Sequence, residues 1–332
     1  MALGQVWIRK TIEDDLDPDR IADSGQCFRW ESSQADRQPS GGGTCGDAAG
    51  ESGRWHPGEC VAEEPRTWRI LAGDRCLYIQ RAAESSAAQA AMQPESSADR
   101  EGAGRGAEFL FSCDEEEFDS FWHPYFDLAT SYRGIRARIH EAEDPFLWRA
   151  ARAQQGIRIL RQNPWETLVS FIISQNKNIP AIRRAIEKLC RAAGERRTDV
   201  FGREYYSFPS PEAVAALPPE ALAACSLGYR SAYVRRAAES VLGGEVDLTE
   251  LMQRPPEQQL QALMQLHGVG VKVASCMQLF GLHSLDAFPV DVWVRRILEA
   301  EYPDGWPMER YAPYNGVMQQ YMFAYYRNLK KI

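Results

Sequence analysis

The stretch LHGVGVKVASCMQLFGLHSLDAFPVDVWVRRIL, from Leu266 to Leu298, decides the fold of this chain. Apolar residues recur at helical spacing up to His267 and again from Val273 onward, so two helices are expected to meet at Gly268-Val269-Gly270. Glycine supplies the backbone freedom that such a tight hairpin needs. The first amides of the second helix then lack intrahelical partners and lie at the positive end of the helix dipole, which suits a phosphate.

A hairpin of this kind also occurs where two helices merely pack together. Two neighbouring residues favour a functional interpretation. Lys272 lies in the first turn of the second helix, where its charge opposes the helix dipole, and Asp291 follows Pro289 and Val290 and is placed to cap a third helix. A surface lysine and an ordinary helix cap would explain each residue singly. Their combination with the hairpin in one stretch is uncommon.

This combination resembles the helix-hairpin-helix DNA glycosylase superfamily, and the motifs below narrow the resemblance to the 8-oxoguanine DNA glycosylase/AP lyase family. The resemblance implies that Lys272 is the nucleophile and that Asp291 assists it. It also implies that the chain needs no cofactor and no metal. The residues it assigns to DNA contact in this stretch are Gly268, Val269, Gly270 and Trp293.

The composition indicates a globular protein. The chain has 332 residues, of which 44% are hydrophobic and 25% charged, enough for one large or two modest cores. No apolar run approaches the roughly twenty residues of a membrane span, and the first residues lack the pattern of a signal peptide. We therefore expect no membrane association, and a location in the cytoplasm with the nucleoid for a prokaryotic source or in the nucleus for a eukaryotic one.

The eight cysteines form no Cys-x-x-Cys pair, so neither a disulfide framework nor a zinc site is indicated. None follows Cys276, which excludes the C-terminal four-cysteine iron–sulfur site of the endonuclease III branch. The net charge of -8 argues against a protein that holds DNA by bulk charge. Residues 147–189, however, carry eight basic and only two acidic side chains, a pattern of either a phosphate-facing surface or a solvated helix.

The amino-terminal part, residues 1–113, is expected to be a small antiparallel β domain with low-complexity inserts at about 31–66 and 81–107. Cys45 and Cys60 lie within the first insert and have no expected role. Helical periodicity dominates from 114 to 332, so the predicted fold class is α+β, with an all-α helix-hairpin-helix glycosylase domain second. The short strands expected in the β domain are Cys27–Trp30, Thr67–Leu71, Cys76–Ile79 and Glu108–Phe111.

The segment Ser24-Gly25-Gln26-Cys27-Phe28-Arg29-Trp30 resembles a signature near the amino terminus of 8-oxoguanine glycosylases. Oxidation at C8 turns N7 of guanine from an acceptor into an N–H donor, so one well-placed acceptor distinguishes the two bases. The resemblance assigns that acceptor to the carbonyl of Gly25, where a side chain would hold the base away. A plain turn before a strand is the alternative.

Two loops are candidates for contact with the strand opposite the lesion. Asn163-Pro164 caps an apolar helix that has Glu166 in its first turn and stops at a polar turn. Within that turn, the resemblance gives Asn176 the role of entering the gap left by an extruded nucleotide. It assigns a wedge to Tyr229 and a forked contact with the orphaned cytosine to Arg230.

One position departs from the family pattern. Ala181 stands where eukaryotic members carry a second arginine that reads the orphaned base. Arg183 and Arg184 follow closely and offer alternative guanidinium groups. We therefore expect the preference for cytosine opposite the lesion to be modest.

The carboxy-terminal helix has Gln319 and Phe323 four residues apart on one face. The resemblance assigns Gln319 to the Watson–Crick edge of the base and Phe323 to its flat face. It places Cys276, one turn after Lys272, on the opposite face of the base, and Pro289 among the base-binding residues. Core packing is the alternative for Phe323 and Cys276.

Together these motifs predict a bifunctional glycosylase that flips 8-oxoguanine out of duplex DNA, excises it and nicks the strand through a lysine Schiff base. The expected partner is double-stranded DNA containing an oxidised purine, bound by a monomer. One alternative is a 3-methyladenine-type glycosylase, which shares the fold and the aspartate but lacks the hairpin lysine. The other is a non-catalytic hairpin module that only binds DNA, which leaves the pairing of Lys272 with Asp291 unexplained.

Overall fold

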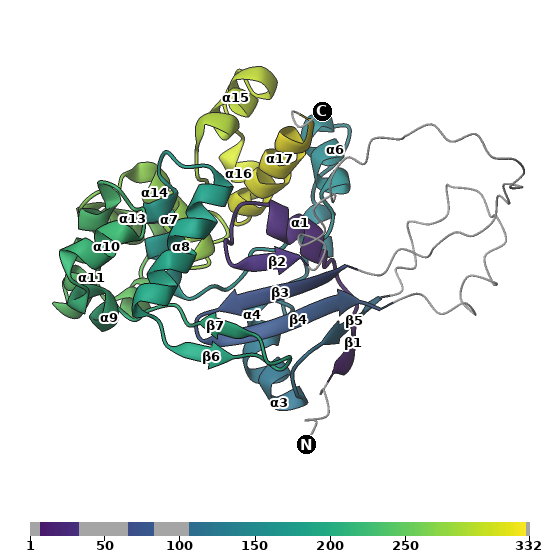
Figure 1. Ribbon diagram of the computed structural model, residues 1–332. Helices are drawn as coiled ribbons and strands as arrows, with labels where there is room; N and C mark the ends of the chain where they lie inside the picture. Colours follow the sequence, from purple (N-terminus) through teal and green to yellow (C-terminus); the bar gives the residue numbers. More distant parts are fainter. Residues whose placement is uncertain (1–6, 33–65, 83–105, 330–332) are drawn as a thin grey trace, which may run out of the picture.

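The computed structural model describes residues 7–32, 66–82 and 106–329. Most of the two predicted inserts, including Cys45 and Cys60, lies outside these residues. An antiparallel sheet of order β1-β5-β4-β3-β2 forms the amino-terminal domain, and Figure 1 shows helices α7 to α17, within residues 164–329, beside and above it. The strands are β1 (Ile8–Ile12), β2 (Trp30–Ser32), β3 (Thr67–Ala72), β4 (Arg75–Arg81) and β5 (Ala107–Phe111). The predicted fold class is confirmed.

Three of the four expected strands are confirmed, with ends that shift by a residue or two. The prediction of a strand over Cys27–Trp30 was wrong, because β2 begins only at Trp30. The preceding residues face the helical domain instead: the Gln26 side chain donates to the carbonyl of Arg158 and accepts from the amide of Leu160. Of the predicted strand before Trp30, Arg29 keeps one contact with the sheet, since its carbonyl accepts from the amide of Leu71 in β3 at 3.0 Å. Strand β1, which pairs with β5, was not predicted.

The helices of the described residues were expected from 114 onward, and α1 (Pro18–Asp23) is an additional one within the sheet domain. The segments that follow β5 are α3 (Glu115–Glu117), a π-helical turn at Phe118–Trp122, α4 (His123–Tyr125), α5 (Tyr132–Arg136), α6 (Pro145–Ala153), α7 (Pro164–Ser174) and α8 (Ile179–Ala193). After these come α9 (Pro211–Ala216), α10 (Pro219–Ala224), α11 (Arg230–Leu242), α12 (Leu248–Leu251), α13 (Pro256–Gln265), α14 (Val271–Phe280), α15 (Val292–Glu301), α16 (Met308–Tyr311) and α17 (Asn315–Leu329).

A small hairpin, β6 (Arg196–Thr198) with β7 (Glu204–Tyr206), interrupts the helices and was not predicted. It returns to the sheet, because Asp199 at its tip accepts from Arg69 at 3.0 Å and from Tyr78 at 2.7 Å. No helix among the described residues is long and apolar enough to cross a membrane.

Two hydrophobic cores result. One lies on the sheet around Trp30, Ile70 and Phe111, and the larger one joins α7, α8, α11, α13, α14 and α17. Helix α14, which carries the predicted nucleophile, is buried from Val273 to Phe280 and packs against α7 and α13. The site is therefore mounted on a buried helix.

Polar contacts hold the two domains together. The guanidinium of Arg158 is fully buried and donates to the carbonyls of Asp15, Phe126, Asp127 and Thr130. Asn163 caps α7 as expected, but Glu166 accepts from the amide of Gly73 at 2.8 Å in the turn between β3 and β4. Arg29 lies 3.7 Å from the same carboxylate.

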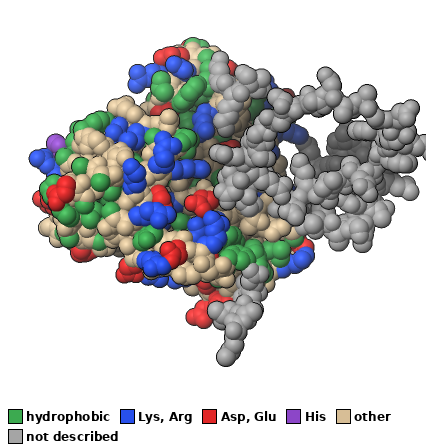
Figure 2. Space-filling view, viewed as in Figure 1, with side chains coloured by type: hydrophobic (Ala, Val, Ile, Leu, Met, Phe, Trp, Pro, Cys, Tyr) green, Lys and Arg blue, Asp and Glu red, His purple; other side chains and the backbone are tan. Residues whose placement is uncertain are grey.

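The basic run at residues 147–189 is therefore not a single phosphate-facing surface. Arg158 belongs to the interior, and Arg161 pairs with the buried Asp127 at 2.9 Å. The charge of the local sequence does not show that these arginines are engaged, because their partners lie elsewhere in the chain. Arg149 and Arg152 are exposed on α6, and the basic side chains of α8 lie where Lys and Arg gather in Figure 2.

Candidate active site

The hairpin between α13 and α14 has the predicted place and geometry. Gly268 adopts a φ of +83°, a region that favours glycine. A Cβ atom there would also lie 2.2 Å from the ring of Tyr233, so both the backbone conformation and the available space require glycine. Gly270 is the exposed N-cap of α14, and no side chain caps this helix. The first amides of α14 are thus open to a ligand from outside the chain.

Lys272 is the second residue of α14, and its Nζ atom lies 5.4 Å from the centroid of the Phe171 ring. Asp291 caps α15, as the sequence predicted, with Oδ1 accepting from the amides of Trp293 and Val294 at 2.9 Å each. Among the described residues Oδ2 has no hydrogen-bond partner. Helix geometry therefore fixes the carboxylate and leaves one oxygen available for chemistry.

Both side chains line one cleft of about 840 Å³. The predicted site residues that line it are Gly25, Asn176, Gly270, Lys272, Asp291, Trp293 and Phe323. They come from the α1–β2 turn, the α7–α8 turn, the hairpin, α15 and α17. The fold thus brings together residues from both ends of the sequence.

Gly25 and Phe323 form one wall of this cleft. Gly25 has a φ of +80°, and a Cβ atom at this position would lie 3.5 Å from Cε1 of Phe323. The glycine turn therefore passes directly over the edge of the phenylalanine ring. A glycine turn and an aromatic ring that line one cleft suit a flat heterocycle, which can stack on the ring while its edge meets backbone groups.

Three other predicted base-binding residues do not line the cleft in this structure. Cys276 is buried, and burial raises the pKa of its thiol to about 11 although neighbouring Lys272 acts in the opposite direction. Gln319 is also buried, with Nε2 donating to the carbonyl of Pro289 at 3.1 Å and Oε1 accepting from Gln320 at 2.9 Å. A base that reached these groups would need side chains of the cleft wall to move.

The predicted insertion loops meet on the other side of the cleft. Asn176 has a φ of +49°, and its Nδ2 atom donates to the hydroxyl of Tyr229 at 3.2 Å. Tyr229 is 52% exposed, as a wedge requires. Gln175 donates from Nε2 to the carbonyl of Gly268 at 3.1 Å and so connects this turn to the hairpin.

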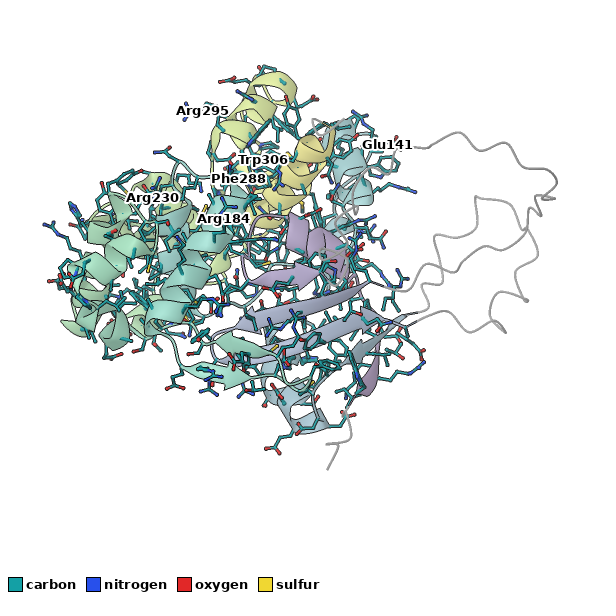
Figure 3. The ribbon with its side chains drawn as sticks, viewed as in Figure 1. Glu141, Arg184, Arg230, Phe288, Arg295 and Trp306 are labelled. Carbon is teal, nitrogen blue, oxygen red and sulfur yellow. The ribbon has the colours of Figure 1, made fainter. Side chains whose placement is uncertain are left out.

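Arg230, labelled in Figure 3, is buried at the start of α11, a helix that packs against α7 and α9. Its guanidinium stacks on the Tyr229 ring at 4.3 Å and donates to the carbonyls of Leu227, at 3.1 Å, and Gln175. Its Nε is buried without a partner among the described residues. The predicted fork is therefore engaged by the backbone in this structure.

The α8 surface next to these loops is basic (Figure 2). Lys177 and Lys188 both reach Ser226, donating to its carbonyl at 2.9 Å and to its hydroxyl at 2.7 Å. Ser226 lies just before the Tyr229 loop. These lysines thus hold the loop as well as adding positive charge beside the cleft.

Sequence reasoning missed several residues of the cleft, among them Phe28, Phe171, Gln175 and Arg327. For Arg327 a signal was present, because it lies one helical turn after Phe323 and so on the same stripe of α17. Phe171 gave no such signal, since an aromatic residue inside an apolar helix predicts only core packing.

Comparison with known proteins agrees with this geometry. Residues 8–168 match the amino-terminal domain of 8-oxoguanine DNA glycosylase, and residues 169–306 match the HhH-GPD superfamily of base excision DNA repair proteins. A Saccharomyces cerevisiae N-glycosylase/DNA lyase is 40% identical over 189 residues, which cover 54% of this chain and 50% of the yeast protein. The matching segments span about half the length of the curated relatives.

Solved structures extend the likeness to nearly the whole chain. MBOgg1 in complex with a low-affinity DNA ligand is 30% identical with a TM-score of 0.75, over 98% of this chain and 97% of that one. The Clostridium acetobutylicum 8-oxoguanine glycosylase/lyase, solved with double-stranded DNA containing cytosine opposite 8-oxoguanine, is 27% identical with a TM-score of 0.73 over 98% and 99%. A 3-methyladenine DNA glycosylase from Archaeoglobus fulgidus, at 18% identity and a TM-score of 0.58, shares the fold alone.

The two family models together match residues 8–306, and Gly25, Lys272 and Asp291, which carried part of the resemblance, line one cleft. The chain therefore belongs to the 8-oxoguanine DNA glycosylase family within the HhH-GPD superfamily.

Proposed function

We propose that this chain is a bifunctional N-glycosylase/DNA lyase that excises 8-oxoguanine from duplex DNA and then nicks the strand. The observation that carries the proposal is the single cleft shared by Lys272, Asp291, Gly25 and Phe323. An amine for attack, a carboxylate for charge stabilisation, a backbone acceptor and an aromatic face are the groups that such a reaction needs.

The target atom is inaccessible inside a duplex, so the nucleotide must leave the base stack at a cost of a few kcal/mol. Stacking on Phe323 offsets part of this cost, and Asn176 and Tyr229 fill the gap that remains in the duplex. The hairpin amides beside Gly270 hold a backbone phosphate. On this proposal the protein recognises the lesion by moving it into the cleft.

In the chemical step, Nζ of Lys272 attacks C1′ as a neutral amine. The C1′–N9 bond breaks and its electron pair leaves with the base, so positive charge develops on the sugar. The carboxylate of Asp291, fixed by two amides of α15, stabilises that charge. Loss of the amine proton and opening of the sugar give a Schiff base, from which β-elimination breaks the strand on the 3′ side.

The carbonyl of Gly25 selects the oxidised base, since only 8-oxoguanine offers an N–H at N7. We propose duplex DNA with cytosine opposite the lesion as the substrate and a monomer as the active form. The corresponding location is the nucleoid of a prokaryotic cell or the nucleus of a eukaryotic one.

Borohydride trapping tests this function. The wild-type protein should form a covalent complex with duplex DNA containing 8-oxoguanine, and none with the same duplex containing guanine. Excision of 3-methyladenine without a trapped complex would instead support the monofunctional alternative. Binding to the 8-oxoguanine duplex without excision or trapping would support the non-catalytic one.

A further inference from the structure

Arg327 is a charged cleft residue to which the proposed reaction assigns no role. It lies near the end of α17, one turn after Phe323, and lines the same cleft as Lys272 and Asp291. Its Nη1 atom donates to the carbonyl of Asp23 at 3.1 Å. Among the described residues this carbonyl is its only hydrogen-bond acceptor, so the other guanidinium donors remain available to a ligand.

The guanidinium lies beside the two groups that form the cleft wall. Its central carbon is 5.5 Å from the centroid of the Phe323 ring. Its Nη1 atom is 3.6 Å from the position that a Cβ of Gly25 would occupy. An arginine donor therefore lies beside the glycine turn and at the rim of the Phe323 ring.

The spacing along α17 indicates which part of a base this donor would meet. Gln319, Phe323 and Arg327 follow one another at four-residue intervals on one stripe, and eight residues correspond to about 12 Å of helix. Gln319 and Arg327 therefore lie on opposite sides of the Phe323 ring along the helix axis. With Gln319 at the Watson–Crick edge and Phe323 under the ring, Arg327 falls at the opposite, C8 edge.

We propose that Arg327 is a specificity-determining residue that donates a hydrogen bond to the O8 carbonyl of the flipped base. The inference rests on the proposed function. In 8-oxoguanine the N7–H donor and the O8 acceptor are adjacent, and Gly25 with Arg327 presents an acceptor beside a donor. Guanine has neither group, since its N7 is an acceptor and its C8 carries only hydrogen. Gly25 and Arg327 together therefore recognise both changes that oxidation makes, the new N7–H donor and the new O8 acceptor.

The test combines one protein change with one atom change in the base. Arg327→Met keeps a long side chain but removes every donor, and 8-thioguanine keeps N7–H but replaces O8 by sulfur, a weak acceptor. Single-turnover excision of each base from the same duplex gives a ratio of rates for each enzyme. In the wild type the ratio should favour 8-oxoguanine, and Arg327→Met should lower it by roughly tenfold, as expected for loss of one charge-assisted hydrogen bond.

Two controls separate this role from a structural one. Strand nicking at a preformed abasic site needs no base, so Arg327→Met should leave that rate within about twofold of the wild-type rate. Arg296→Met removes a guanidinium that stacks on the cleft residue Trp293 at 5.1 Å, and it should keep the wild-type ratio.

An equal loss on both bases, with an unchanged ratio, would show that Arg327 only holds the glycine turn through Asp23. An equal loss at the abasic site would show a general DNA contact. Either result overturns the inference while leaving the excision reaction in place. Absence of 8-oxoguanine excision by the wild-type enzyme overturns the proposed function itself, and the inference with it.

Discussion

The two sides of the cleft differ in how their polar groups are used. On the lesion side, Lys272 and Asp291 both line the cleft, and one oxygen of Asp291 has no hydrogen-bond partner among the described residues. On the opposite-strand side, Arg230 is buried and already donates to the carbonyls of Leu227 and Gln175. The lesion side is thus arranged for chemistry before DNA arrives. On the opposite-strand side, the Arg230 guanidinium that is expected to contact the orphaned cytosine instead holds the neighbouring loops in place.

This difference predicts that substitutions on the lesion side lower the rate of excision and that those on the opposite-strand side change the preference for the opposing base.

The largest effect is expected from Lys272→Gln, which removes the nucleophile but leaves the hairpin amides in place. Excision should fall by a factor of about 10³ or more, and borohydride trapping should vanish. Duplex binding, measured by fluorescence anisotropy, should change little. Excision at the wild-type rate would rule out Lys272 as the nucleophile.

Asp291→Asn should have the second-largest effect. Asparagine caps a helix about as well as aspartate, so the melting temperature should stay close to that of the wild type. The carboxylate charge is lost, however, and single-turnover excision should slow by roughly 10² to 10³. A large drop in melting temperature with a matching drop in rate would instead make Asp291 a cap and nothing more.

Gly25→Ala should have a smaller effect, because the nearest ring atom of Phe323 is at an ordinary contact distance from the added Cβ. The cost arises from the φ of +80°, which is unfavourable by about 1–2 kcal/mol for a residue with a side chain. Excision of 8-oxoguanine should slow by roughly tenfold, while nicking of an abasic site stays unchanged. Equal losses in both assays would mean that the turn positions DNA generally.

The last prediction concerns selectivity for the base opposite the lesion, and the rate of excision opposite cytosine should change least. Since Arg230 is engaged and Ala181 has no donor, cytosine should be preferred only modestly. Ala181→Arg in the first turn of α8 should sharpen the preference by about 1–3 kcal/mol if it makes a forked contact. Single-turnover excision with each of the four opposing bases measures this. Steep cytosine selectivity in the wild type would show that another guanidinium, such as that of Arg184 on α8 (Figure 3), reads the base.

The sequence predicted those parts of the site that local rules determine. The hairpin, the Asp291 cap and the Asn163 cap follow from glycine, spacing and side-chain chemistry within a few residues, and all three are present. The fold class followed in the same way, since alternation and helical periodicity change near residue 114.

The parts that were wrong or missed depend on residues distant in sequence. Arg158 looked like a surface charge, but four carbonyls of other segments surround it. Arg327 became a cleft residue only because α17 packs beside the glycine turn. No rule of spacing or propensity reports such contacts, since they arise when the two domains close on each other.

Gln175 joins three segments at once. Its side chain donates to the carbonyl of Gly268 in the hairpin, and its own carbonyl accepts from Arg230 beside the Tyr229 loop. The Asn176 turn, the Tyr229 loop and the hairpin are therefore ordered relative to one another in the free protein. The conformational entropy of arranging them is lost during folding, so it does not have to be lost again each time the protein engages DNA. A protein that samples many undamaged sites for each lesion benefits from this at every encounter.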